Sequence, residues 1–132
     1  MERVSGIGGF FFRANDPDAL GRWYALHLGV SMPPPTYDDP DWWQQEGPTV
    51  WGIFATDSVE LGRLDAPWMI NFRVRDLDAM VDQLRRAGIV VTIDPNEYPN
   101  GRFATTADPE GNPIQLWQPN AAAMRRPSEE SR

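Results

Sequence analysis

Hydrophobic residues recur with helical spacing in two stretches of the chain, about sixty residues apart. Each stretch follows an aspartate, Asp16 or Asp76, whose carboxylate is suited to accept hydrogen bonds from the first turn of a helix. Each ends at a glycine, Gly29 or Gly88, the residue favoured just past a helix C-terminus. The pattern predicts two amphipathic helices, with apolar faces made of Leu20, Trp23, Tyr24, His27 and Leu28, and of Met80, Val81, Leu84 and Ala87.

Short apolar or alternating stretches around these helices predict strands. One stretch precedes each helix, at 9–13 and at 69–74. Three follow each helix, at 30–32, 42–45 and 49–55 in the first half and at 89–93, 102–107 and 113–118 in the second. The last two flank Asp-Pro-Glu-Gly-Asn at 108–112, a turn sequence typical of a hairpin. Each half is therefore predicted to be a β-α-β-β-β unit, which gives an α+β fold.

The two halves are also related in sequence. Phe, Arg, Asp, Asp and Ala coincide at five of nine positions when residues 12–20 are aligned with 72–80. Such a repeat indicates that one structural unit occurs twice. We therefore expect a single domain over 1–118, with a first module at about 6–56, a connector at about 57–66 and a second module at about 67–118, followed by a flexible tail over 119–132.

Composition removes several classes of chemistry. The 132 residues contain no cysteine and one histidine, His27, which excludes thiol nucleophiles, zinc fingers and iron–sulfur ligation. All twelve basic residues are arginines, and with nineteen acids they leave a net charge of −7, which disfavours nucleic acid as a partner. Because no long apolar segment occurs, we expect no membrane interaction and a cytoplasmic location.

Several motifs together resemble the vicinal oxygen chelate superfamily, which contains glyoxalase I, bleomycin-resistance proteins and extradiol dioxygenases. They are the duplicated unit, the Phe-Arg-x-x-Asp-x-Asp-Ala string at the start of each helix, the His-Leu-Gly at 27–29 and the string from Asp108 to Trp117. The resemblance covers about residues 6–118. It implies a cup-shaped open sheet with the helices on its outer face, often completed by a second chain. It does not select a chemistry, because unrelated activities share this scaffold.

In metal-using members of the superfamily, four ligands project into the cup. Strand alternation places the equivalent positions at Gly9, Met69 and Gln115, with the fourth near 52–54, where no carboxylate exists. Of these, only Gln115 could coordinate such an ion, and one neutral amide is too weak to hold a divalent ion. We therefore expect no metal and no cofactor, and we assign no catalytic residue. His27 lies on a helix of the outer face, so we interpret it as structural.

The same alternation predicts which side chains line the cup. Aromatic rings there suit a planar ligand or a cation, whereas the two arginines of the repeat favour an anion. In the simpler interpretation, the arginines pair with acids at the helix starts, and each tryptophan is a core or interface residue. The predicted ligand-binding residues are Phe11, Arg13, Trp51, Met69, Asn71, Arg73, Gln115 and Trp117.

These observations favour a metal-independent protein that binds a small molecule, with sequestration of an antibiotic or an aromatic metabolite as its role. Two alternatives stay open. One is a lyase, isomerase or dioxygenase of the superfamily with a non-standard site, and the other is a protein-interaction scaffold whose cup is filled by its own side chains. Open sheet edges and a half-covered cup also predict a homodimer.

Overall fold

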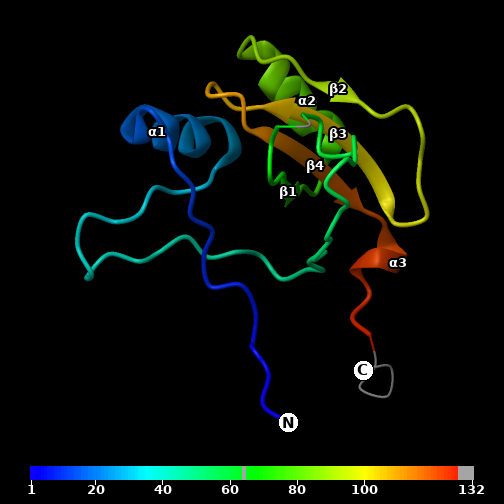
Figure 1. Ribbon diagram of the computed structural model, residues 1–132, viewed down its shortest axis with the longest axis horizontal. Coiled ribbons are helices and arrows are strands. Elements are labelled where there is room, and N and C mark those ends of the chain that lie inside the picture. The colour runs from blue at the N-terminus through cyan, green and yellow to red at the C-terminus, as the bar shows by residue number, and fades with distance from the viewer. Residues whose placement is uncertain (64, 128–132) are drawn as a thin grey trace.

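The computed structural model describes residues 1–63 and 65–127, and this part of the chain forms three helices and four strands. Figure 1 shows the strands and α2 gathered together, with α1 beside them and the first residues and the segment after α1 running outside as coil. The predicted α+β class is confirmed. The order is α1 (Pro17–Leu28), β1 (Ile70–Arg73), α2 (Leu77–Arg86), β2 (Thr92–Ile93), β3 (Gly101–Ala107), β4 (Pro113–Pro119) and α3 (Ala121–Met124).

Both predicted amphipathic helices form, with the predicted caps. Asp16 and Asp76 each accept a hydrogen bond from the backbone N–H three residues further on, at 3.1 and 3.0 Å. Gly29 closes α1 with a φ of +71°, and its N–H donates to the Tyr24 carbonyl. Gly88 follows α2 with a φ of +81°. These left-handed backbone angles explain the two glycines, because other residues adopt them only with strain.

The four strands form one sheet in the order β1-β4-β3-β2. β1 runs parallel to β4, with Asn71 beside Gln115. β3 and β4 form the predicted antiparallel hairpin, with Phe103 beside Trp117. β1 and the two-residue β2 are therefore the open edges of the sheet.

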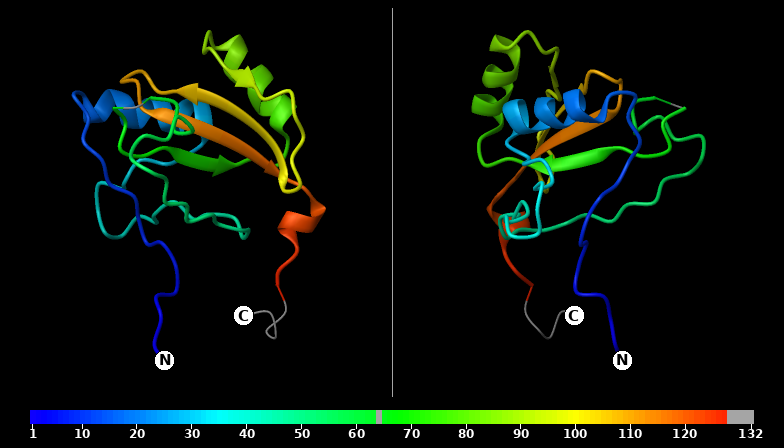
Figure 2. Two further views of the ribbon diagram at one scale, coloured as in Figure 1. Left: turned by 45° about the vertical axis from the view of Figure 1, so that its right-hand side comes forward. Right: turned by 90° about the vertical axis from the view of Figure 1, so that its left-hand side faces the viewer.

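α1 and α2 cover the same face of this sheet, as the two views of Figure 2 show. Their apolar stripes bury side chains against the alternate residues of the strands that point toward the helices. The result is one continuous core made of Leu20, Tyr24, Leu77, Val81, Leu84, Val91, Ala104, Ile114 and Leu116.

The turn between β3 and β4 fastens α1 to the sheet. The Tyr24 hydroxyl donates to the buried Asp108 carboxylate at 2.7 Å. The Glu110 carboxylate accepts from the backbone N–H groups of Asn15 and Asp16, at 2.6 and 3.1 Å. Since the free N–H groups of a helix start need acceptors, this turn in the second half caps the helix of the first half.

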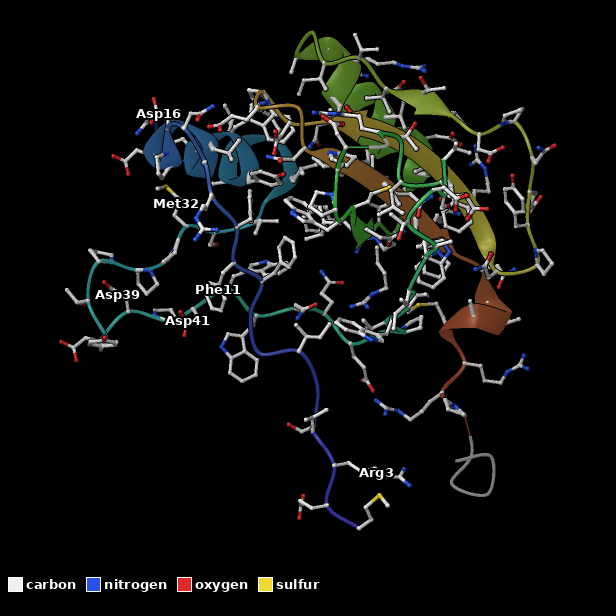
Figure 3. The ribbon with its side chains drawn as sticks, in the orientation of Figure 1. Arg3, Phe11, Asp16, Met32, Asp39 and Asp41 are labelled. Carbon is white, nitrogen blue, oxygen red and sulfur yellow. The ribbon has the colours of Figure 1, made fainter. Side chains whose placement is uncertain are left out.

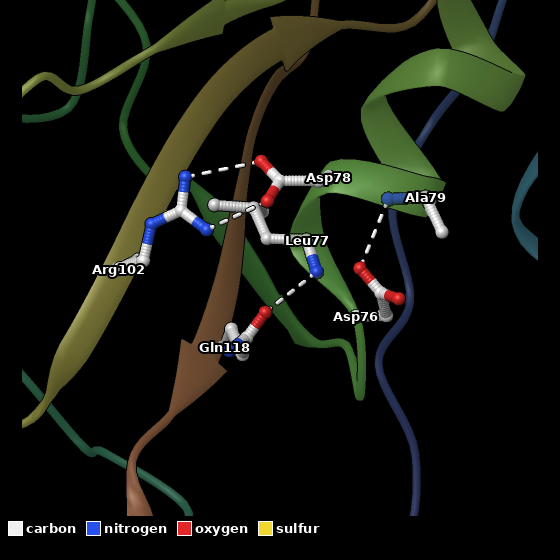
Figure 4. A network of polar contacts seen from close by, with 6 residues as sticks. All are labelled: Asp76, Leu77, Asp78, Ala79, Arg102 and Gln118. Carbon is white, nitrogen blue, oxygen red and sulfur yellow. Dashed lines mark hydrogen bonds and ion pairs between the residues drawn. The ribbon is translucent and has the colours of Figure 1, made fainter.

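The start of α2 is fixed in a similar way, shown in Figure 4. The Gln118 side-chain oxygen accepts from the Leu77 N–H at 2.8 Å. Arg102 on β3 donates both guanidinium N–H groups to Asp78 at 3.1 Å. The pKa of Asp78 is lowered from 3.8, first by this hydrogen bond and then by the charge of Arg102. α2 is thus tied to both central strands.

The strands predicted in the first half are not formed within the single chain, and this corrects the two-module sheet expected from the sequence. Residues 9–13, 30–32, 42–45 and 49–55 have no strand pairing. In two of these segments, residues two apart lie on the same side, since a Cβ placed on Gly9 would touch the Phe11 ring and one placed on Gly52 would touch the Phe54 ring. A strand also needs a partner for its N–H and C=O groups, and a sequence pattern specifies the faces of a strand but not that partner. In the second half, only Thr92 and Ile93 of the predicted 89–93 pair.

The tail predicted from residue 119 begins as ordered structure. Asn120 caps α3 by accepting from the Ala123 N–H at 2.9 Å, and its side chain donates to the Pro99 carbonyl at 2.8 Å. Asn120 therefore joins α3 to the loop before β3, a contact that composition did not reveal. Residues 128–132 of the predicted tail lie outside the described residues. Within 1–63 and 65–127, none of the helices is long and apolar enough to cross a bilayer.

Candidate functional site

The candidate site is the face of the sheet that the helices leave uncovered. Ile70, Phe72, Ile114 and Leu116 belong to the helix-side core, so the residues that alternate with them point the opposite way. We call this surface the helix-free face, and it is made of Asn71, Arg73, Phe103, Gln115 and Trp117, with Met69 continuing the alternation ahead of β1.

Two aromatic rings stack on the helix-free face. The rings of Phe103 and Trp117 lie 6.1 Å apart between centroids and are almost parallel, at 4°. The Trp117 indole N–H donates to the Asn100 carbonyl at 3.0 Å, which fixes the tilt of the buried indole. Tyr98 meets the edge of Phe103 at 5.7 Å. The arrangement holds both rings in a fixed orientation, with Phe103 half-buried and Trp117 buried.

Two side-chain amides lie next to these rings. The Asn71 Nδ2 donates to the Gln115 Oε1 at 2.7 Å across the parallel pair of β1 and β4. This hydrogen bond uses one donor and one acceptor, and each amide has further polar atoms. The amide pair can therefore offer both a hydrogen-bond donor and an acceptor to a ligand lying over the sheet.

Arg73 reaches across to the first half of the chain. Its guanidinium donates to the Gln45 carbonyl at 2.7 Å, to the Pro48 carbonyl, and to the Thr49 hydroxyl at 3.4 Å. The sequence left two uses open for this arginine, an anionic ligand or a carboxylate at the start of a helix. In the described part of the chain its hydrogen bonds go to neutral oxygens, and it is Arg102 that pairs with Asp78.

The structure does not bring all eight predicted residues together. Met69, Asn71, Arg73, Gln115 and Trp117 share the helix-free face. Phe11, Arg13 and Trp51 lie on the unpaired segments of the first half instead, where Phe11 is 93% and Trp51 80% exposed. Figure 3 shows Phe11 on the N-terminal segment, away from the sheet.

The residues at the positions of the family's metal ligands do not fit a metal ion. Gln115 is engaged with the Asn71 amide, and Met69 offers a thioether, a poor ligand for hard cations. In 1–63 and 65–127 no three His, Cys, Asp or Glu side chains gather closely enough to hold a metal. We derive no chemistry through a metal for this site.

Two surface hollows, of about 190 and 240 Å³, lie near the turn between β3 and β4. The first is lined by Arg63, Asp65 and Trp68 together with the turn, and the second by Leu20, Trp23 and the turn. None of the eight predicted residues lines either of these two hollows. The candidate site is thus the open sheet face and not one of these hollows.

Sequence reasoning missed the polar contacts that hold the site's scaffold in place. Asp108 accepts from Tyr24 and from the Asn112 side chain, both at 2.7 Å. Burial, and then the bond to Asp108, raises the pKa of Tyr24 far above its ordinary 10.0. The Asp-Pro-Glu-Gly-Asn string signalled the bonds within the turn, whereas nothing in it pointed to Tyr24. His27 packs its ring against Trp23 on α1, in agreement with a structural role.

Comparison with known proteins identifies the family. The family model described as a glyoxalase-like domain matches residues 9–117, which spans both halves of the repeat. Among solved structures, TnmS3, an antibiotic binding protein from Streptomyces sp. CB03234, is similar with a TM-score of 0.59 and 22% identity, over 91% of this chain and 100% of that one. A protein from the mobile metagenome of V. Pseudocholerae is similar with a TM-score of 0.54 and 16% identity, over 89% and 97%.

A search of curated proteins found no significant match. At these identities the two solved structures establish a shared fold and nothing about ligands. The match across 9–117 confirms the resemblance found in the sequence motifs, and the chain belongs to the glyoxalase-like domain family of the vicinal oxygen chelate superfamily.

Proposed function

We propose that the protein binds a planar aromatic small molecule on its helix-free face, without a metal ion, and that it sequesters an antibiotic or an aromatic metabolite. The observation that carries the proposal is the parallel pair of Phe103 and Trp117, with the Asn71 and Gln115 amides beside it. Flat rings with a few convergent polar groups are the usual composition of a small-molecule site. The shared fold of TnmS3, an antibiotic binding protein, supports this role.

The charge of the ligand follows from two observations. The chain carries a net charge of −7, which attracts cations. Three of the five N–H donors of Arg73 are already used by oxygens of residues 45–49, which weakens its hold on an anion. A cationic or neutral aromatic compound is therefore the expected ligand.

The test is a tryptophan-fluorescence titration with one cationic and one anionic planar aromatic compound of similar size. We expect saturable quenching by the cationic compound. In the Phe103→Leu variant its affinity falls about two- to tenfold, because an aromatic pair is worth ~0.5–1.5 kcal/mol beyond its buried area.

The matched control is Tyr37→Leu, which removes a fully exposed ring outside the face and leaves the affinity unchanged. Tighter binding of the anionic compound, or an equal loss in both variants, contradicts the proposal. Metal analysis of protein purified without chelator is the second check. One stoichiometric metal ion per chain would contradict metal-independent binding and favour an enzyme of the superfamily instead.

A homodimer in the cytoplasm is part of this proposal. In the single chain the helix-free face is partly covered, since Asn71 is exposed and Trp117 is buried, and a second chain can cover the apolar surface around it.

A further inference from the structure

The helix-free face continues beyond β3 to the edge of the sheet at β2. Ile93 and Ala104 pair with one another and pack on the helix-side core, so the next pair along these strands, Asp94 and Phe103, points the other way. The Asp94 N–H donates to the Phe103 carbonyl at 2.9 Å, which fixes the two residues beside each other. Asp94 therefore belongs to the helix-free face, although it lies just past the end of β2.

One line of residues crosses this face from edge to edge. It runs from Asp94 through Phe103 on β3 and Trp117 on β4 to Arg73 on β1, because each of these residues lies beside the next in the strand pairing. The two stacked rings thus have a carboxylate beyond one end and a guanidinium beyond the other. Since neighbouring strands lie ~4.8 Å apart, the two charged residues are about 14 Å from each other and do not pair directly.

The two ends of this line differ in how accessible they are. At one end, Trp117 is only 4% exposed and the Arg73 guanidinium is bonded to residues 45–49. At the other end, Phe103 and Asp94 are half-buried and the adjacent Tyr98 is 39% exposed. Figure 1 shows the loop after β2 on the side of the molecule away from α1. The accessible part of the aromatic pair is therefore the end next to Asp94.

The Asp94 carboxylate is held in place without being neutralised. Its two oxygens accept from the Asn96 N–H at 3.0 Å and from the Tyr98 hydroxyl at 2.8 Å. These two bonds, the first more than the second, lower the pKa of Asp94 from 3.8, so the group is ionised at neutral pH. In the described part of the chain no ion pair involves Asp94. The arginine nearest in the sheet, Arg102 on β3, points to the opposite side and binds Asp78.

We propose that Asp94 is the residue that selects a positively charged ligand, whose cationic group lies between this carboxylate and the rings of Tyr98 and Phe103. Tyr98 meets the edge of Phe103 at 5.7 Å while its hydroxyl holds Asp94, so the two rings and the carboxylate lie together at the edge of the face. A carboxylate accepts about four hydrogen bonds, of which Asp94 uses two within the chain, and aromatic rings attract cations. The inference rests on the proposed function and deepens it, because the net charge of −7 attracts a cation to the molecule without placing it.

The test compares two planar compounds of the same shape, N-methylquinolinium, which carries a positive charge, and its uncharged carbon analogue methylnaphthalene. Equilibrium dialysis gives the affinity of the unmodified protein and of each variant for both compounds. Asp94→Asn keeps the size of the side chain and an acceptor for the Asn96 N–H but removes the charge. We expect the ratio of the two affinities, charged over uncharged, to fall about tenfold in this variant, as for an ion pair at the protein surface.

Asp82→Asn is the matched control, because it makes the same charge change on an exposed residue of α2, the helix that covers the opposite face of the sheet. It leaves the affinity ratio unchanged. Partial unfolding of a variant lowers both affinities and does not change their ratio, so the comparison holds even for a destabilised protein.

An equal fall of the ratio in both variants, or no fall in Asp94→Asn, overturns the role of Asp94 and leaves the binding function standing. Equal affinities of the unmodified protein for the two compounds also overturn the role of Asp94. If neither compound binds the unmodified protein saturably, the proposed function fails, and the role of Asp94 fails with it.

Discussion

At the scale of single residues, Tyr24 and Asp108 form the contact on which the docking of α1 depends. The carboxylate is buried, and besides the hydroxyl it accepts from the N–H groups of Glu110 and Asn112 at 2.9 and 3.1 Å. A buried carboxylate needs all its hydrogen bonds, since each lost bond leaves part of its desolvation uncompensated. The pair also joins positions 84 residues apart in the chain.

Tyr24→Phe is expected to lower the free energy of unfolding by about 1.5–3 kcal/mol at neutral pH, because it removes one hydrogen bond to a buried charged group. Chemical denaturation measures the change, with Tyr37→Phe as the control on a fully exposed ring.

The unmodified protein also loses stability above pH 10.0, since the unfolded Tyr24 ionises there while the folded one keeps its proton. Tyr24→Phe lacks this part of the loss of stability at alkaline pH. Identical pH profiles of stability for Tyr24→Phe and the unmodified protein would contradict the role assigned to Tyr24.

At the scale of elements, each helix of the repeat starts at the same aspartate cap but is supported differently. Both caps accept from the N–H of the third helical residue. The start of α1 also receives the Glu110 carboxylate from the turn between β3 and β4, whereas the start of α2 receives Gln118 from β4. The repeat therefore conserves the local cap and not the long-range contact.

Asp76→Ala is expected to lower stability by about 1 kcal/mol, because it leaves the Ala79 N–H without its acceptor. The matched control is Asp82→Ala within α2, where the same change removes an exposed carboxylate and keeps or slightly raises stability through the better helix propensity of alanine. Thermal unfolding of both variants measures the difference, and equal losses would show that Asp76 does not act as a cap.

At the scale of the whole molecule, the two halves are joined by α1 and by Arg73. α1 packs on the sheet formed by the second half, and Arg73 holds the segment 45–49 beside the end of β1. Between these joints the chain from Val30 to Gln45 lies outside the sheet, as the labelled Asp39 and Asp41 of Figure 3 show. Beyond the apolar packing of α1, the position of the first half therefore depends on a few polar contacts, among them those of Arg73 and the ion pair of Glu46 with Arg126.

Arg73→Met is expected to loosen this segment, because the hydrogen bonds to Gln45, Pro48 and Thr49 are lost while the aliphatic stem is kept. Limited chymotrypsin digestion after Trp42, Trp43 and Trp51 becomes several times faster, in proportion to the open population. Arg75→Met makes the same charge change on an exposed neighbour and leaves the rate unchanged. Equal rates for both variants would show that Arg73 does not hold the segment.

The sequence by itself determined the helices with their caps, the hairpin of β3 and β4, and the face on which Asn71 and Gln115 lie. These features depend on neighbours within a few residues, so periodicity and residue chemistry suffice to predict them. The tertiary structure alone decided that α1 packs on the sheet of the second half, that Arg102 and not Arg73 pairs with Asp78, and that Phe11 and Trp51 stay apart from the helix-free face. Those outcomes depend on contacts between distant parts of the chain. A strand pattern specifies which side chains face inward, but it does not specify which strand, or which copy of the chain, pairs with the backbone of that strand.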